Sequence, residues 1–145
     1  MIGNLVGNII TPTKDYHTDG LMCMNLNHVK KDNMKVGVIG SRGFNDYEKL
    51  TQIMDEIKDV HLIVSGGAKG ADLLGEKWAN ENGVETLIFK PNWSKYGKRA
   101  GFIRNEDIVK NSDYIIAFWN GNSKGTENSI NLAKKLNIPI KIINY

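Results

Sequence analysis

The sequence predicts an α/β fold, a Rossmann-like three-layer sandwich around a five-stranded, mainly parallel sheet with the strand order 3-2-1-4-5. The order of the segments along the chain predicts it. From Met34 to Tyr145, short apolar runs rich in β-branched residues alternate with segments of helical periodicity. Such alternation indicates parallel strands, because right-handed crossovers return the chain to the same end of the sheet and cover both faces with helices.

The five expected strands are short and apolar, as strands buried on both faces are. The first is dense in β-branched residues and ends in a glycine. In order, the strands are MKVGVIG (34–40), HLIVS (61–65), VETLIF (84–89), DYIIAFW (113–119) and IPIKII (138–143).

The four expected helices are residues 46–58, 71–82, 104–112 and 126–137. Asn45 and Glu48 have the spacing of a capping box at the start of the first, and Gly83 ends the second. In the second helix Trp78 is expected in the core. The apolar faces of the first and last helices are expected to consist of Tyr47, Leu50, Met54 and Ile57, and of Ile130, Ala133 and Leu136.

Residues 1–33 differ in composition from the rest of the chain. They are rich in Asn, Thr, Asp and Gly, show no helical period, and contain one apolar cluster, LVGNII (5–10). We therefore expect one domain, residues 34–145, preceded by a poorly structured leader or N-terminal extension, residues 1–33, that contributes at most one short strand.

Composition and charge exclude several classes of protein. The single cysteine, Cys23, excludes an intrachain disulfide and fits a reducing cytoplasm, and the three histidines are scattered. No apolar run is long enough to span a membrane. We therefore expect a cytoplasmic protein with no metal, no cofactor and no membrane partner.

The distribution of charge is more informative than the net charge of +3. Between Ile88 and Asn105 the chain has five basic residues and no acidic one. A positive field of this kind suits an anionic ligand, although lysines are also usual in a solvated loop. The five are Lys90, Lys95, Lys98, Arg99 and Arg104.

Three glycine-bearing loops follow expected strands: the first loop, GSRGFN (40–45), the second loop, SGGAKGAD (65–72), and the last loop, NGNSKGTE (120–127). Carboxyl ends of parallel strands lie at one edge of the sheet, where ligands bind. Each loop precedes a helix, whose N-terminal N–H groups and dipole favour an anion. We expect the loops to form one phosphate site, with the amides of residues 67–71 facing the anion. One such loop alone is equally typical of a tight turn.

None of the loops matches the dinucleotide pattern G-x-G-x-x-G or the Walker pattern G-x-x-x-x-G-K-[ST]. Instead VGVIGSRGF, VSGGAKGAD, EKWA, PNWSKYGKRAG, RNEDIV and KGTEN, in this order, closely resemble the DUF2493 or YspA-like (cpYpsA-related) family of the SLOG superfamily, which also includes the LOG phosphoribohydrolases and the DprA DNA-processing proteins. The resemblance covers residues 34–145. Its most specific block, W-x-x-x-G-x-x-A-G-x-x-R-N, consists of Trp93, Gly97, Ala100, Gly101, Arg104 and Asn105.

The resemblance implies a Rossmann-like protein that binds a nucleotide or nucleotide-derived small molecule. We expect it to act as a sensor or a sequestering module and to form a homo-oligomer (a dimer or higher). The resemblance also implies ligand- and phosphate-binding residues, carried over by position. These are Gly40, Ser41 and Arg42 in the first loop, Ser65, Gly66, Gly67, Gly70 and Asp72 in the second, Arg104 and Asn105 before the fourth strand, and Gly121, Gly125 and Thr126 in the last loop.

The last loop departs from the LOG pattern P-G-G-x-G-T-x-x-E. Gly125 and Thr126 match it, but Ser129 occupies the glutamate position, and Glu127 directly follows the threonine. The usual carboxylate for stabilising a ribosyl cation or activating water is therefore replaced. Glu127 is the remaining catalytic candidate, although residues two apart on a helix do not share a face. Hydrolysis of a nucleotide N-glycosidic bond, the LOG reaction, stays an alternative function.

A third hypothesis is binding of single-stranded DNA, because residues 90–104 carry aromatic side chains among the basic ones. A net charge of +3 without a dense basic face argues against a nucleic-acid partner. The individual residues also have structural interpretations. Arg42 fits a charged turn, Arg104 a helix cap or ion pair, and Asp72 a helix-dipole partner. Trp93 and Tyr96 fit either stacking on a base or ordinary packing.

Overall fold

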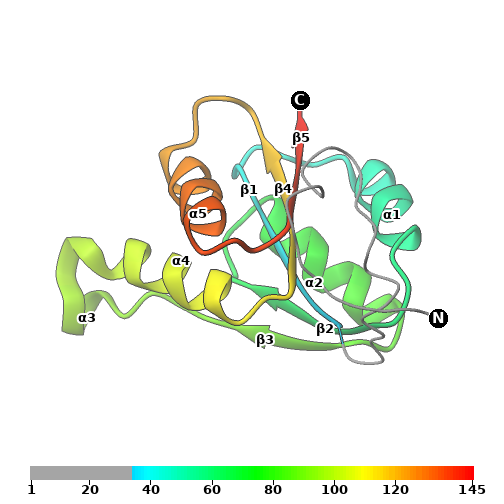
Figure 1. The fold of residues 1–145 in the computed structure, drawn as a ribbon, viewed down its shortest axis with the longest axis horizontal. Coiled ribbons are helices and arrows are strands. Elements are labelled where there is room, and N and C mark those ends of the chain that lie inside the picture. The colour runs from blue at the N-terminus through cyan, green and yellow to red at the C-terminus, as the bar shows by residue number, and fades with distance from the viewer. Residues whose placement is uncertain (1–33) are drawn as a thin grey trace.

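The computed structural model describes residues 34–145, which form a parallel sheet between two layers of helices (Figure 1). The expected leader, residues 1–33, and its short strand lie outside the described residues. The strand order is β3-β2-β1-β4-β5 and all four pairings are parallel, which confirms the predicted fold class and order. The strands are β1 (Met34–Gly40), β2 (Val60–Ser65), β3 (Glu85–Ile88), β4 (Tyr114–Trp119) and β5 (Ile140–Asn144).

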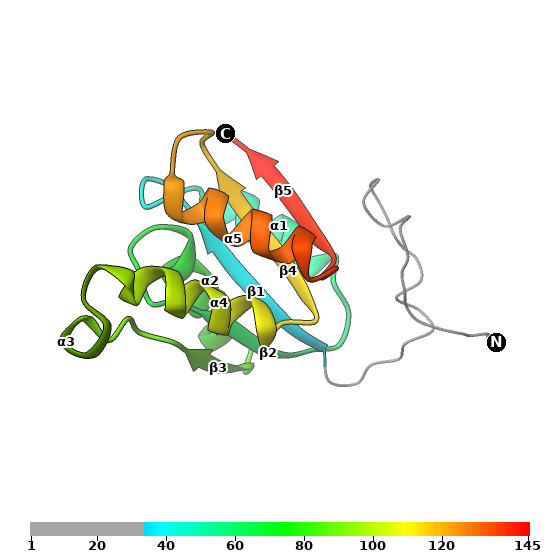
Figure 2. The same ribbon diagram turned by 60° about the vertical axis from the view of Figure 1, so that its left-hand side comes forward.

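Two hydrophobic cores lie on opposite faces of the sheet. On one face, α1 (Tyr47–Asp55) and α2 (Ala71–Glu81) cover β1, β2 and β4 with Leu50, Met54 and Trp78. On the other face, α4 (Ala100–Lys110) and α5 (Lys124–Lys135) contribute Ile108 and Ile130. Strand β1 supplies both cores because alternate side chains of a strand point to opposite faces. It therefore lies at the centre of the molecule (Figure 2).

Two residues near the ends of helices differ from the sequence expectations. The cap of α1 is Asp46, whose carboxylate accepts from the Lys49 amide at 3.0 Å, and not Asn45. Asp46 supplies the same kind of short polar side chain one residue later. At the end of α5, Leu136 is 39% exposed, so its expected inward position is wrong. Gly83 has φ +68° just beyond α2, which fits the predicted glycine stop.

The basic segment after β3 is helical over a longer stretch than expected. It contains α3 (Trp93–Tyr96), the 3-10 helix η3 (Gly97–Arg99) and then α4, which begins at Ala100 and not at Arg104. The Asn92 side chain caps α3 by accepting from the Lys95 amide at 3.1 Å. The segment projects from the end of the sheet, at the left of Figure 1.

Within residues 34–145, none of the helices is both long and apolar enough to cross a bilayer.

Candidate functional site

The three loops meet at the carboxyl edge of the sheet, as predicted, and two contacts hold them together. A Cβ placed on Gly70 would collide with the carbonyl oxygens of Ser41 and Arg42, so the second loop lies directly against the first. The Ser41 hydroxyl is buried and accepts from the Asn120 amide at 3.2 Å, which joins the first loop to the last. The second of these contacts lies between the ends of β1 and β4, where the order of the sheet reverses.

Asp72 closes the second loop from within. Its Oδ2 atom accepts from the amides of Gly66 at 3.1 Å and Ala68 at 3.3 Å, while the Ser65 hydroxyl accepts from the Gly67 amide at 3.1 Å. The expectation that residues 67–71 all present their amides to an anion is therefore wrong for Gly67 and Ala68. The amides that lack an intrahelical partner are those in the first turn of α2, as at every helix start.

Arg104 reaches from α4 across to the second loop. Its Nη1 atom donates to the Gly66 carbonyl at 2.7 Å, and its Nε atom donates to Asn105 Oδ1 at 3.1 Å. Asn105 is itself buried and donates through Nδ2 to the Gly125 carbonyl at 3.3 Å and to Asn128 at 3.2 Å. Two adjacent residues of α4 therefore connect the second loop with the last.

The charges around Gly66 explain the electrostatics of Arg104. Burial lowers the pKa of the guanidinium, the nearby Asp72 carboxylate raises it, and the positive charge of Arg42 lowers it further. Arg42, which is exposed, and Arg104 are thus close enough to repel each other. An anion between them would relieve this repulsion.

Lys90 is a third cation at this edge, and it is not among the site residues expected from the sequence. A Cβ placed on Gly67 would lie 3.8 Å from its Nζ atom, so the ammonium lies over the second loop. The sequence indicates Lys90 only as a member of the basic stretch after β3. Its position over the second loop depends on how β3 pairs with β2, which the sequence does not show. Gly67 has φ +74°, so the loop also needs glycine for its backbone.

The ionisation of Asp72 is the most perturbed carboxyl equilibrium at this edge. Burial raises its pKa, hydrogen bonds from Ala68 and Gly66 and the charge of Arg104 lower it, and Glu76 raises it, giving about 6 in place of 3.8. Glu76 lies one turn later on α2 and accepts from the Ser65 hydroxyl at 2.7 Å. The sequence signal for Glu76 was its i, i+4 spacing from Asp72.

Asp72→Asn is expected to flatten the pH dependence of stability. The pKa of Asp72 is higher in the folded chain than in the unfolded chain, so the folded chain binds the proton more tightly. As pH rises from about 4 to about 6, loss of this proton therefore lowers the free energy of unfolding. Over that pH range the free energy of unfolding of the wild type should fall by about 3 kcal/mol relative to Asp72→Asn. Urea unfolding of both proteins at several pH values measures it. Parallel curves would contradict the raised pKa.

The last loop is organised by its own side chains. Asn120 Oδ1 accepts from the amides of Asn122 at 2.8 Å and Ser123 at 3.0 Å, and the Ser123 hydroxyl caps α5 by accepting from the Thr126 amide at 3.3 Å. Gly121 has φ +86°, which this turn requires. A Cβ on Gly125 would meet nothing within 4 Å. Gly125 is therefore free of packing demands.

The structure separates the predicted site residues into two groups. One group holds the loops in shape through buried contacts: Gly40, Ser41, Ser65, Gly66, Gly70, Asp72, Asn105 and Thr126. The residues of the other group remain accessible to a ligand at the edge of the sheet. Arg42, Gly121 and Gly125 are exposed, Gly67 is partly exposed, and Arg104 is half-buried. Across residues 34–145, there is no cluster of three or more His, Cys, Asp or Glu side chains suited to a metal ion.

The two candidate catalytic positions in α5 lie in different environments. Ser129, at the position of the LOG glutamate, is 2% exposed. Glu127 lies in the first turn, with its carboxylate 3.9 Å from Lys124 Nζ and its side chain 45% exposed. Only Glu127 therefore offers an accessible carboxylate in this helix turn.

The fold is similar to that of two DNA processing proteins of known structure. DNA processing protein A (DprA) from Streptococcus pneumoniae matches with a TM-score of 0.65 and 19% sequence identity, over 75% of this chain and 50% of that protein. DprA from Helicobacter pylori, whose structure is described as showing a single-stranded DNA binding mode, matches with a TM-score of 0.60 and 23% identity, over 75% of this chain and 64% of its own. At these identities the similarity establishes the fold alone. This chain spans about half to two thirds of the length of those proteins.

Two further comparisons concern the sequence. Gene 61 protein of Mycobacterium phage D29 is 33% identical over 119 residues, which cover 73% of this chain and 93% of the phage protein. The family model described as YspA, cpYpsA-related SLOG family matches residues 34–96, which contain β1, the first and second loops and α3. The fold, the loops and these matches agree, and the chain belongs to the YspA, cpYpsA-related SLOG family.

Proposed function

We propose that this protein binds a nucleotide or nucleotide-derived small molecule at the carboxyl edge of the sheet, as a sensor or a sequestering module. The main support is the arrangement of cations around the second loop. Arg104 is half-buried and fixed by the Gly66 carbonyl, with Arg42 and Lys90 close by. Among the described residues the ion pairs are Lys110–Glu106 and Lys124–Glu127, so none of the three cations is in an ion pair, and Asp72 is a carboxylate near Arg104. Such a cluster favours a phosphate.

The proposed geometry assigns a part of the ligand to each element. The phosphate lies between the guanidinium groups of Arg42 and Arg104, near the first turn of α2, whose dipole favours negative charge. Ile88 is 37% exposed and contacts the position of a Gly67 side chain at 3.2 Å, so it offers apolar surface beside the cations. The base or another flat group would pack there.

Ligand identification is the direct test. We expect a nucleotide-like compound to co-purify with the protein from cells, to be identified by mass spectrometry, and to raise the melting temperature when added back to the emptied protein. Arg42→Ala should fold normally, since the side chain is exposed, and should bind that compound about tenfold less tightly. Equal affinity of the wild type and Arg42→Ala would contradict the proposed phosphate position.

Gly125→Ala tests whether the last loop approaches the ligand. The new methyl group has open space around it and lies in the first turn of α5, so stability should stay equal or rise by about 0.5–1 kcal/mol. If the backbone at this position contacts the ligand, affinity for the co-purified compound falls while the melting temperature holds. We expect that loss. Unchanged affinity would remove Gly125 from the proposed site.

The alternative function is LOG-like hydrolysis of a nucleotide N-glycosidic bond. The observation that favours it is the exposed Glu127 carboxylate beside the last loop. Incubation with nucleoside monophosphates followed by chromatography detects a released base, and Glu127→Gln should abolish its release. Binding without turnover would leave the sensor or sequestering function.

We propose that the protein is a homo-oligomer in the cytoplasm. The use of a single cysteine supports a reducing compartment. Sedimentation velocity of the full chain tests the first statement, and fractionation of host cells tests the second.

A further inference from the structure

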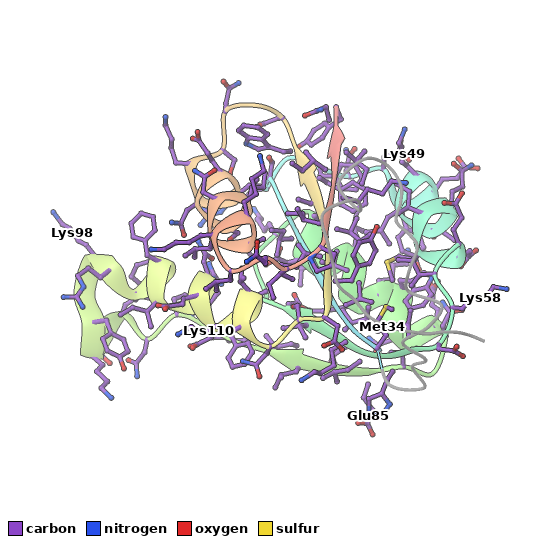
Figure 3. All side chains as sticks on the ribbon, viewed as in Figure 1. Met34, Lys49, Lys58, Glu85, Lys98 and Lys110 are labelled. Atoms are coloured by element: carbon purple, nitrogen blue, oxygen red, sulfur yellow. The ribbon has the colours of Figure 1, made fainter. Side chains whose placement is uncertain are left out.

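Residues 90–102, which we call the basic arm, form a projection beside the candidate site. The arm comprises α3, η3 and the start of α4, and it extends away from the sheet in both ribbon views (Figures 1 and 2). Residues 92–99 are all exposed. Figure 3 shows Lys98 at this end of the molecule, far from Lys49 and Lys58 at the opposite end. The arm is therefore free to contact a partner.

Three aromatic side chains of the arm are exposed: Trp93 at 57%, Tyr96 at 37% and Phe102 at 54%. The Trp93 ring lies against α4, since a Cβ on Gly101 would be 3.7 Å from it. The Lys95 ammonium lies 5.1 Å from the centre of the Tyr96 ring. Trp93 therefore contacts α4 while most of its surface faces solvent, and Tyr96 is about one third exposed. Aromatic rings held in this way present flat apolar faces outward.

All the charged side chains of the arm are positive. The arm carries Lys90, Lys95, Lys98 and Arg99, and no acidic residue lies within it. Burying two copies of this surface against each other in a symmetric dimer would bring like charges together, which opposes that pairing. The complementary partner is anionic and has flat faces of its own.

We propose that the basic arm binds single-stranded nucleic acid. Unpaired bases stack on exposed aromatic rings, and lysine and arginine neutralise the phosphates between them. A duplex would offer only its phosphates, since its base faces are stacked inside. The net charge of +3 argued against nucleic acid at the sequence level, but four of the cations are concentrated on this one projection.

The arm is continuous with the loop site, which gives a strand a path across the molecule. Gly101, under the Trp93 ring, precedes Arg104 by three residues, or about 4.5 Å along α4. Arg104 in turn contacts Gly66 of the second loop. The strand contacts Trp93 and Phe102 first, with its phosphates near Lys95, Lys98 and Arg99. This binding does not require a nucleotide in the loop site.

Fluorescence anisotropy with labelled oligo(dT) of about 20 nucleotides tests the proposal on the full chain, with oligo(rU) of the same length distinguishing DNA from RNA. We expect Trp93→Ala combined with Phe102→Ala to weaken binding about tenfold or more, and Lys95→Glu combined with Lys98→Glu to do the same and to reduce the salt dependence. The control is Lys49→Glu combined with Lys58→Glu, which makes the same charge change at the opposite end and should bind far better than the arm variant.

Tryptophan fluorescence provides a second measurement. Trp93 is far more exposed than Trp78, so stacking of a base should quench the emission of the wild type, and Trp93→Phe should lose that quenching while keeping most of the affinity. Melting temperatures of the variants should match the wild type. Equal binding by the arm and control variants would overturn the proposal. So would arm variants that keep oligonucleotide binding and instead change the sedimentation coefficient, which would assign the arm to a second copy.

Discussion

Gly70→Ala is expected to lower the free energy of unfolding by roughly 3 kcal/mol or more. Gly70 caps α2 with φ +86° and ψ −132°, a conformation that side chains rarely adopt. Its missing side chain is also the space in which the carbonyl oxygens of Ser41 and Arg42 lie. A methyl group therefore adds backbone strain and separates the first loop from the second. Urea unfolding at one pH measures the loss.

Gly43→Ala is the matched control for this prediction. Gly43 belongs to the first loop, and a Cβ there would meet nothing within 4 Å. Its free energy of unfolding should stay within about 0.5 kcal/mol of the wild type. A Gly70→Ala protein as stable as Gly43→Ala would mean that the two loops are not in the described contact.

Arg104→Ala is expected to weaken binding of the co-purified compound by about 1–3 kcal/mol, or roughly 10–100-fold. Two effects combine. The variant loses a cation that is already fixed in position by the Gly66 carbonyl, and Gly66 loses the donor that holds the second loop. Arg104→Lys should restore only part of the affinity, because an ammonium lacks the planar fork that bonds the loop and a phosphate together.

Lys110→Ala is the control for Arg104→Ala, since Lys110 lies on the same helix but is exposed and paired with Glu106 at 2.9 Å. Titration calorimetry should give it the wild-type affinity. If Arg104→Ala and Lys110→Ala bind equally well, the second loop does not hold the phosphate.

Much of the fold was accessible from the sequence because buried parallel strands and amphipathic helices have different periods. The order of the sheet followed from handedness and alternation, and it is confirmed. The helices α3 and η3 of the basic arm could not be predicted from the sequence, for a physical reason. The turn WSKY is too short to show a period of 3.6 residues, and Gly97 and Gly101 indicated a loop. Its stability depends on the Asn92 cap.

The candidate site was predictable as a location but not in its details. Convergence of the loops follows from the parallel sheet alone. The use of the Gly67 and Ala68 amides inside the loop could not be predicted, because it depends on Ser65 and Asp72 turning toward their own backbone. The positions of both side chains are set by β2 and by the first turn of α2, which only the folded chain brings together.

The hydrogen bonds from Gly66 through Arg104 and Asn105 to Gly125 have a dynamic consequence. Two loops that belong to different halves of the sheet are joined through one pair of adjacent side chains, so neither opens without straining the other. In hydrogen exchange, the amides of Gly66 and Ala68 should therefore share an opening free energy with those at the start of α5. We therefore expect the edge of this sheet to open as one cooperative unit, and a ligand that orders one loop to order both.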